Sequence, residues 1–357
     1  MRRFVLGTGV TIIVLAALGY LFRGPLVMRL MARVVASNLE TDLLRELPDG
    51  LHVALCGAGS PLPDPTRSGP CTAVIAGDRL YVVDTGAGGS RTLAEMRIPQ
   101  GAIDGILLTH FHSDHIDGLG EMLLQRWAGG SSTTPTPVYG PVGLERVLEG
   151  FALAYSADRQ YRIAHHGEQV VPPVGAGGIA HEFAVPVDGE RVTLIDDAGL
   201  VISAFRVAHE PVEPAVGYRF DYKGRSVVLS GDTTKSANVE RFAAGADLLV
   251  HEALAPHLLM VITDGARAAG RTNLVKIMED IPDYHTSPVE AAEVAHAAGV
   301  DHLLFNHIVP PLPAAPLEEL FVEGVAEAYS GPVTVGRDGT LVTLAAHAAS
   351  IEVSNLL

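Results

Sequence analysis

The chain has 357 residues, of which 48% are hydrophobic, and a formal net charge of −16. This length and apolar content suffice for a large core, while two cysteines are too few for a disulfide scaffold or a cysteine-based zinc site. Nucleic-acid binding relies on clustered Lys and Arg, and no basic run occurs after residue 35. The charge therefore predicts that nucleic acid is not a partner.

The N-terminus carries an apolar run over residues 4–22, preceded by Arg2 and Arg3. A run of about 20 residues crosses a bilayer core, whereas the apolar part of a signal peptide is about 7–15 residues long. We predict that residues 1–22 form a transmembrane anchor, with a cleaved signal segment as the alternative. The expected localisation is the plasma (inner) membrane, single-pass, with the catalytic domain periplasmic or extracellular-facing.

Residues 23–50 are predicted to form a helical connector, because apolar residues recur there at near-helical spacing until Pro48. We assign residues 51–357 to one catalytic domain. It begins with a strand at 51–55, and a hairpin at 71–83 follows a proline-rich loop. An apolar strand at 103–108 comes next. Residues 129–137 are predicted as a loop and residues 155–190 as irregular structure, because both are rich in Gly and Pro.

Strand patterns return in the second half of the chain. They cover residues 192–195, 200–207, 216–221, 226–230, 248–250 and 303–305. Helices are expected at 288–298 and about 317–329, and a hairpin is expected to turn at Asp338-Gly339 between 333–335 and 341–344. Strands with helices between them in each half predict an α/β fold with two sheets packed face to face and helices outside.

Four metal-binding side chains follow the strand at 103–108 within six positions: His110, His112, Asp114 and His115. Imidazole and carboxylate groups are the ligands that zinc takes in catalytic sites. His110 and His112 are expected to project together, and Asp114 and His115 toward a second point. A polar surface loop is the alternative interpretation.

This motif resembles that of the metallo-β-lactamase-fold hydrolases, and four further motifs follow that family's order. They are Val82-Val83-Asp84-Thr85-Gly86, Val207-Ala208-His209, Leu229-Ser230-Gly231-Asp232-Thr233 and Phe305-Asn306-His307. The resemblance spans about residues 51–345 and implies an αββα sandwich with two zinc-type ions, other divalent transition metals being possible. One ion would lie on His110, His112 and His209, the second on Asp114, His115 and His307, with Asp232 bridging both. Asp84 and Asp117 are candidates for orienting the histidine ligands.

Within that family, three segments resemble the ribonuclease Z and arylsulfatase-like branch: those that begin at His209, at His251 and at Tyr284. The resemblance implies catalytic roles for Asp114, Glu252 and His285, the last two as a relay that protonates the leaving group. A helix-start residue and a solvated carboxylate are the structural alternatives for His285 and Glu252. His165 and His166 are expected to be exposed on the surface.

The segments at 57–61 and 67–70 are most similar to the arylsulfatase-like members. The main functional prediction is therefore a hydrolase of a small anionic sulfate or phosphate ester. A ribonuclease Z-like phosphodiesterase is one alternative, although residues 171–178 lack the basic character of that enzyme's RNA-holding arm. A lactonase or β-lactamase-like hydrolase, an iron protein of the same fold and a non-enzymatic binding module are the others.

Cys56 ends the first predicted strand of the domain and Cys71 begins the next. A bridge between them requires Cα atoms roughly 4.4–6.8 Å apart and an oxidising compartment. We expect two buried free thiols and keep the disulfide as the alternative.

Overall fold

The computed structural model describes residue 20, residues 23–37 and residues 42–357. The chain divides into two compact units, Met1–Leu43 and Leu44–Leu357. In the first unit, residues 23–37 are helical and exposed. The predicted anchor at 1–22 lies outside the described residues apart from Tyr20. Over the part of the chain that is described, no helix has both the length and the apolar character needed to cross a bilayer.

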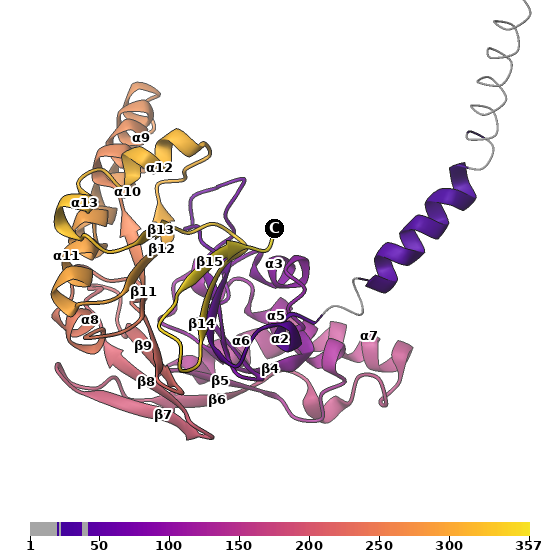
Figure 1. Cartoon of the computed structure of the whole chain (residues 1–357). Helices are drawn as coiled ribbons and strands as arrows, with labels where there is room; N and C mark the ends of the chain where they lie inside the picture. Colours follow the sequence, from indigo (N-terminus) through magenta and orange to yellow (C-terminus); the bar gives the residue numbers. More distant parts are fainter. Residues whose placement is uncertain (1–19, 21–22, 38–41) are drawn as a thin grey trace, which may run out of the picture. The chain divides into compact units, whose positions relative to one another are not determined.

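The second unit is built on two sheets that lie face to face (Figure 1). The strands of the first sheet are, in spatial order, β15 (Glu352–Asn355), β14 (Thr340–Ala345), β1 (Gly50–Gly57), β2 (Cys71–Ala76), β3 (Arg79–Val83), β4 (Ile103–Leu107), β5 (Thr136–Pro141) and β6 (Gly178–Phe183). Those of the second are β13 (Val333–Val335), β12 (His302–Val309), β11 (Leu248–Leu254), β10 (Arg225–Leu229), β9 (Val216–Tyr222), β8 (Leu200–Arg206) and β7 (Arg191–Asp197).

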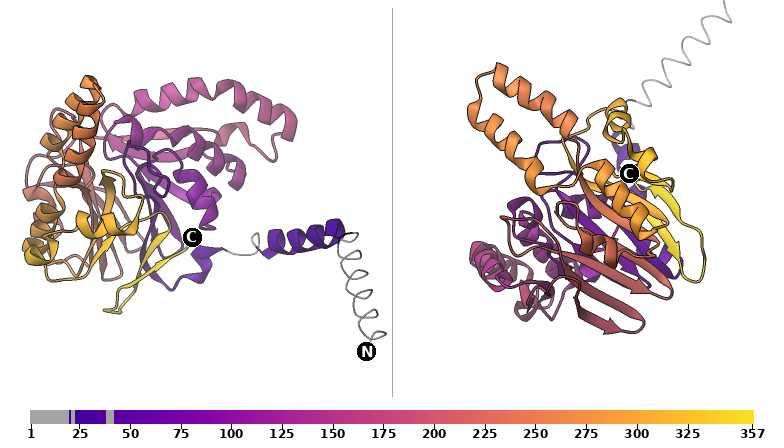
Figure 2. Two further views of the ribbon diagram at one scale, coloured as in Figure 1. Left: turned by 90° about the horizontal axis from the view of Figure 1, so that it is seen from above. Right: turned by 90° about the vertical axis from the view of Figure 1, so that its left-hand side faces the viewer.

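Helices cover the outer faces of both sheets (Figure 2). On the first sheet lie α3 (Gly89–Glu95), α5 (Leu119–Gly130), α6 (Leu144–Ala154) and the adjoining α7 (Ser156–His166). With the second sheet lie α8 (Ala237–Phe242), α9 (Pro256–Ala268), α10 (Thr272–Asp280), α11 (Pro288–Ala298), α12 (Ala315–Phe321) and α13 (Val325–Ala328). The remaining helical segments are α2 (Leu43–Glu46), α4 (Ser113–Ile116), η1 (Gln100–Ala102), η2 (Pro173–Gly175) and η3 (Ile281–Tyr284). The predicted two-sheet α/β architecture is confirmed.

Two apolar layers hold this arrangement together. Leu51, Val53, Phe220 and Val250 belong to a layer that joins the two sheets. Ala291, Ala295 and Phe305 belong to a second layer, between the second sheet and its helices. The small alanines on α11 let that helix lie close to β11 and β12. Both layers end where the strands end, and the polar side chains described below lie there.

Three local predictions were wrong. Residues 155–190 are not irregular throughout, because they contain α7 and β6. The helix expected at 317–329 is two helices, separated near Gly324, whose φ of +82° is left-handed. The expected hairpin at Asp338-Gly339 does not form, because β13 belongs to the second sheet and β14 to the first. Asp338 instead accepts hydrogen bonds from the backbone amides of Ala58 (3.0 Å) and Ser68 (2.8 Å).

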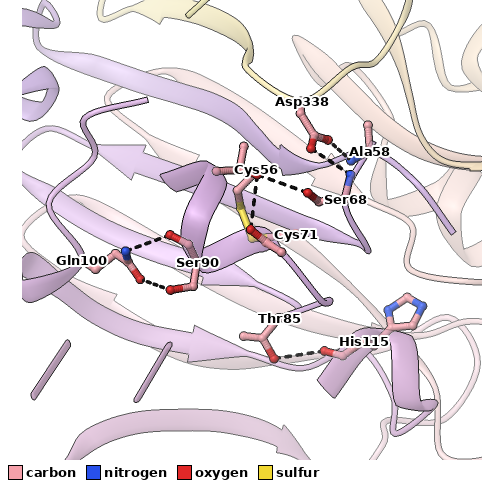
Figure 3. Close-up of a disulfide and its surroundings, with 11 residues drawn as sticks. Cys56, Ala58, Ser68, Cys71, Thr85, Ser90, Gln100, His115 and Asp338 are labelled. Carbon is pink, nitrogen blue, oxygen red and sulfur yellow. Dashed lines mark hydrogen bonds between the residues drawn. A yellow bond between two sulfur atoms is a disulfide. The ribbon is translucent and has the colours of Figure 1, made fainter. Parts of the chain in front are cut away.

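Cys56 and Cys71 form a disulfide, against our expectation of free thiols (Figure 3). Their Cα atoms lie 4.9 Å apart because β1 and β2 are antiparallel neighbours. In the register, Cys71 pairs with Gly57, the residue that follows Cys56. The bridge closes the proline-rich loop at its base. The same loop touches the chain near the histidine cluster, since Gly86 N donates to Pro70 O at 2.8 Å.

Replacing both cysteines by serine is expected to lower the free energy of unfolding by about 3 kcal/mol, because the bridge spans 15 residues and cross-linking a loop of this size restricts the unfolded chain. Urea denaturation of the oxidised wild type and the variant measures the difference. Wild type treated with reductant controls for the added hydroxyl groups. Full alkylation of both cysteines in protein never exposed to reductant would contradict the bridge itself.

Candidate metal centre

Seven polar side chains from four segments meet at the ends of the strands. The loop after β4 provides His110, His112, Asp114 and His115, and α4 begins within that loop. His209 follows β8, Asp232 follows β10, and His307 lies in β12. All except the half-buried His112 are at most 9% exposed. The structure therefore brings together every residue that the sequence predicted as a metal ligand, and their role as ligands stays a prediction.

Local backbone geometry aims two of these side chains. Gly231 has a φ of +62°, and a Cβ atom there would lie 2.7 Å from Val216 O, so glycine sets the turn into Asp232. The β11–β12 register shifts so that Asn306 pairs with Glu252 and Ile308 with Ala253, which leaves His307 unpaired in a bulge. His307 itself has a φ of 42°, a left-handed conformation that is uncommon outside glycine.

The donor atoms form two groups. In one, ligand atoms of His110, His112, His209 and Asp232 all lie within 4.8 Å of one another, and in the other those of Asp114, His115 and His307 do so. Asp232 Oδ2 lies 3.8 and 4.0 Å from Nε2 of His110 and His209, and 3.2 and 3.4 Å from Nε2 of His115 and His307. One carboxylate oxygen therefore faces imidazoles of both groups, as a bridging ligand would.

Hydrogen bonds on the far side of the rings fix which nitrogen faces the centre. His115 Nδ1 donates to Asp84 Oδ2 at 2.8 Å, and His110 Nδ1 donates to Thr109 Oγ1 at 3.0 Å. The Thr109 hydroxyl in turn donates to Asp84. His209 Nδ1 donates to the backbone oxygen of Tyr284 at 2.9 Å. These three rings are thus held with Nε2 toward the donor groups, the arrangement that orients histidine ligands in metalloproteins.

The ionisation of His110, His209 and Asp232 also suits a metal. Burial lowers the pKa of His110 well below its usual value, and it also lowers the pKa of His209, so both rings are neutral donors. Burial opposes charge on Asp232 as well, but His307 and His115 hold its pKa well below the usual value. His115 behaves differently, because Asp232 and Asp84 outweigh burial and raise its pKa well above normal.

Three buried atoms at this centre have no hydrogen-bond partner in the described part of the chain: His115 Nε2, Asp232 Oδ1 and His307 Nδ1. A buried polar atom without a partner costs about 1–3 kcal/mol. These atoms, together with the imidazole and carboxylate donors that face one another, fit divalent transition-metal ions.

Asp84→Asn is expected to weaken metal affinity about 10- to 100-fold, because Asp84 holds His115 directly and His110 through Thr109. Titration with a competing chelator measures this. Asp117, the second orienting candidate, is exposed and makes no hydrogen bond to an imidazole within the described residues. Asp117→Asn is therefore the control and should bind metal as the wild type does. Equal affinity in all three proteins would contradict the orienting role of Asp84.

The predicted relay residues lie beside the two donor groups. His285 Nδ1 donates to Glu252 Oε1 at 2.9 Å, and the His285 ring stacks on His307 with centroids 5.5 Å apart. Glu252 is 1% exposed, which rules out a solvated carboxylate, and its Oε1 also accepts from the amides of Thr233 and Thr286. Burial opposes charge on His285, but Glu252 raises its pKa to about 9. The contact with Glu252 therefore favours the protonated form of His285.

Sequence reasoning missed the supporting residues Thr109, Thr233 and Tyr284. Thr109 and Thr233 adjoin predicted ligands, which was the available signal. Tyr284 contributes through its backbone carbonyl, which no sequence pattern reveals. His165 and His166 are exposed on α7, as expected.

A large cleft adjoins the centre at Asp114. Its volume is about 730 Å³, and it is lined by the proline-rich loop at residues 60–69, by α3 and by residues 113–117. A substrate of substantial size can therefore approach the donor groups from this side.

Comparison with known proteins gives three concordant results. A model of the β-lactamase superfamily domain matches residues 79–308. Ribonuclease Z of Mycobacterium bovis is 36% identical over 290 residues, which cover 81% of this chain and 96% of that protein. Two solved structures share the fold. The metallo-β-lactamase-fold protein YhfI of Bacillus subtilis has a TM-score of 0.56 at 17% identity, and the match covers 82% of this chain and 99% of the YhfI chain. The short form of human tRNase Z has a TM-score of 0.57 at 22% identity, with the same two coverages.

These results correct several predictions. The relatives' names favour the ribonuclease Z alternative over a sulfate or small phosphate ester hydrolase, and the arylsulfatase-like assignment finds no support. They also contradict the exclusion of nucleic acid, which relied on net charge although binding depends on local charge. The predicted membrane partner and the single-pass inner-membrane localisation are contradicted by the same relatives.

Proposed function

Because the chain belongs to the β-lactamase superfamily, as a hydrolase with the metallo-β-lactamase fold, we propose that it is a ribonuclease Z-like phosphodiesterase that cleaves RNA. The observation that carries the proposal is the alignment with ribonuclease Z, which is 36% identical along 96% of that enzyme. The aligned region is long enough to include the donor groups as well as the His285–Glu252 pair.

The metal ions would be two Zn²⁺, one held by His110, His112 and His209 and the other by Asp114, His115 and His307, with Asp232 between them. His and carboxylate donors favour zinc over the oxygen-preferring Mg²⁺ and Ca²⁺. When bound, such a pair of ions polarises a phosphoryl oxygen and lowers the pKa of an attacking water.

The chain's own residues would manage the proton of the leaving group. Cleavage of a phosphodiester forms a bond from phosphorus to the attacking water oxygen and breaks the bond to a ribose oxygen, which needs a proton as it departs. His285 holds such a proton, because Glu252 stabilises the imidazolium form at 2.9 Å. The capping box of Ser287 and Glu290 at the start of α11 fixes the backbone that follows His285.

Cationic side chains for an RNA backbone lie on the outer helices rather than in the 171–178 loop. Arg146 on α6 and Arg159 on α7 are exposed and form no ion pair within the described residues. Arg162 adds a third charge, partly offset by Asp158 at 2.6 Å. The same two helices also carry Glu145, Glu149 and Asp158, so the arginines offer individual phosphate contacts rather than a net positive surface.

The test is cleavage of a precursor transfer RNA that carries a 3′ trailer, by purified full-length protein loaded with zinc. We expect cleavage at a single position, two metal ions per chain, and no hydrolysis of 4-nitrophenyl sulfate. An intact precursor together with sulfate ester, lactone or β-lactam turnover by the same metal-loaded preparation would overturn the proposal.

A further inference from the structure

We infer that the Tyr284 ring is a stacking platform for the nucleobase of the nucleotide that carries the leaving oxygen. This inference rests on the proposed RNA cleavage and adds a specificity-determining residue to it. Tyr284 ends η3, a short helical segment between α10 and the loop that contains His285.

The ring of Tyr284 lies against two imidazoles of the candidate centre. Its centroid is 5.2 Å from that of His209, with planes at 78°, and 4.9 Å from that of His285, with planes at 46°. The ring is therefore fixed beside both a predicted metal ligand and the predicted proton donor.

The Tyr284 side chain is also not fully engaged by contacts within the protein. Tyr284 is only partly buried, and its hydroxyl has no hydrogen-bond partner in the described part of the chain. Other tyrosines of the fold differ in this respect, since the hydroxyls of Tyr218 and Tyr329 donate to the backbone oxygens of Leu108 and Val300. Tyr284 therefore retains exposed surface beside the candidate centre.

The neighbour of Tyr284 decides which base would stack. His285 is the group that would protonate the departing ribose oxygen, so the nucleotide that carries this oxygen must lie beside His285 and within reach of the adjacent ring. Stacking of a base on an aromatic side chain tolerates any sequence, since every base has a π face.

Tyr284→Ala is an informative variant, because the hydrogen bond to His209 comes from the Tyr284 backbone oxygen and survives removal of the ring. Metal content is therefore expected to stay at the wild-type level. The control is Tyr139→Ala. Tyr139 is another partly buried tyrosine; it lies on β5, and its ring stacks on that of His181 with centroids 4.8 Å apart.

The experiment compares wild type and Tyr284→Ala on two forms of one RNA, intact and abasic at the nucleotide that carries the leaving oxygen. Removing either the ring or the base is expected to raise KM about 5- to 150-fold, and removing both should raise it no further. Tyr284→Phe and Tyr139→Ala should show the wild-type KM on the intact RNA.

Independent, multiplying effects of the ring and the base would overturn the inference, as would a Tyr284→Phe variant that behaves like Tyr284→Ala. If the wild type cleaves the intact RNA but neither Tyr284→Ala nor the abasic nucleotide changes KM, this inference alone is overturned. A wild type that cleaves no RNA would instead overturn the proposed function.

Discussion

Asp232→Ala is expected to release most of the bound metal and to reduce RNA cleavage by about 10³-fold or more. Asp232 Oδ2 lies within 4.0 Å of four imidazole nitrogens, so its removal takes the one shared oxygen from both donor groups. A metal pair contributes several kcal/mol to stabilising a transition state, which corresponds to such a factor. Metal analysis by plasma mass spectrometry and single-turnover cleavage measure the two effects.

The matched control for this substitution is Asp197→Ala, because the Asp197 side chain is 78% exposed and lies on β7 away from the donor groups. It should keep both metal ions and full activity. A purified Asp232→Ala protein that kept two metal ions and wild-type turnover would show that the assignment of two bridged ions is wrong.

His285→Ala is expected to keep both metal ions and to lose about 10²- to 10⁴-fold in rate, the usual contribution of a positioned proton donor. The loss should be largest for substrates with poor leaving groups, which depend most on protonation. Since the pKa of His285 is raised to about 9, wild-type cleavage should be insensitive to this group at neutral pH and should fall above about pH 9, where the proton is lost. The variant should lack that fall.

A second histidine separates this effect from any general loss of imidazole. His257 is exposed, and its ring hydrogen-bonds the backbone oxygen of Leu320, so His257→Ala should retain wild-type rates. Equal losses by His285→Ala on 4-nitrophenyl esters and on RNA would remove the proton-donor role and leave His285 as a structural residue.

The donor groups were predictable because each ligand sits in a short motif at the end of a strand. His110 to His115 form a local cluster, and the resemblance supplied His209, Asp232 and His307. The bulge that aims His307 was not predictable, because it depends on pairing between β11 and β12. The carbonyl of Tyr284 that orients His209 was hidden for the same reason, since it acts across 75 positions of sequence.

Elements with few buried residues were predicted least well. α7 has no buried residue, and we interpreted it as irregular because of the Gly- and Pro-rich stretch that follows it. The separation of β13 from β14 shows a related limit. Asp338-Gly339 has the composition of a hairpin turn, but the Asp338 carboxylate binds the amides of Ala58 and Ser68, and the two strands join different sheets. The disulfide likewise depends on β1–β2 register rather than on cysteine spacing.

The distribution of the donors along the chain also constrains when the centre is complete during synthesis. The first cluster belongs to the first sheet, whereas His209, Asp232 and His307 follow or lie in strands of the second. A nascent chain that has reached residue 300 contains six of the seven donors but lacks His307 and the β12 strand that carries it. Contacts this distant in sequence form late in folding. Under the proposed assignment of two metal ions, stoichiometric metal uptake would signal nearly complete assembly of both sheets and would serve as a late folding reporter in refolding experiments.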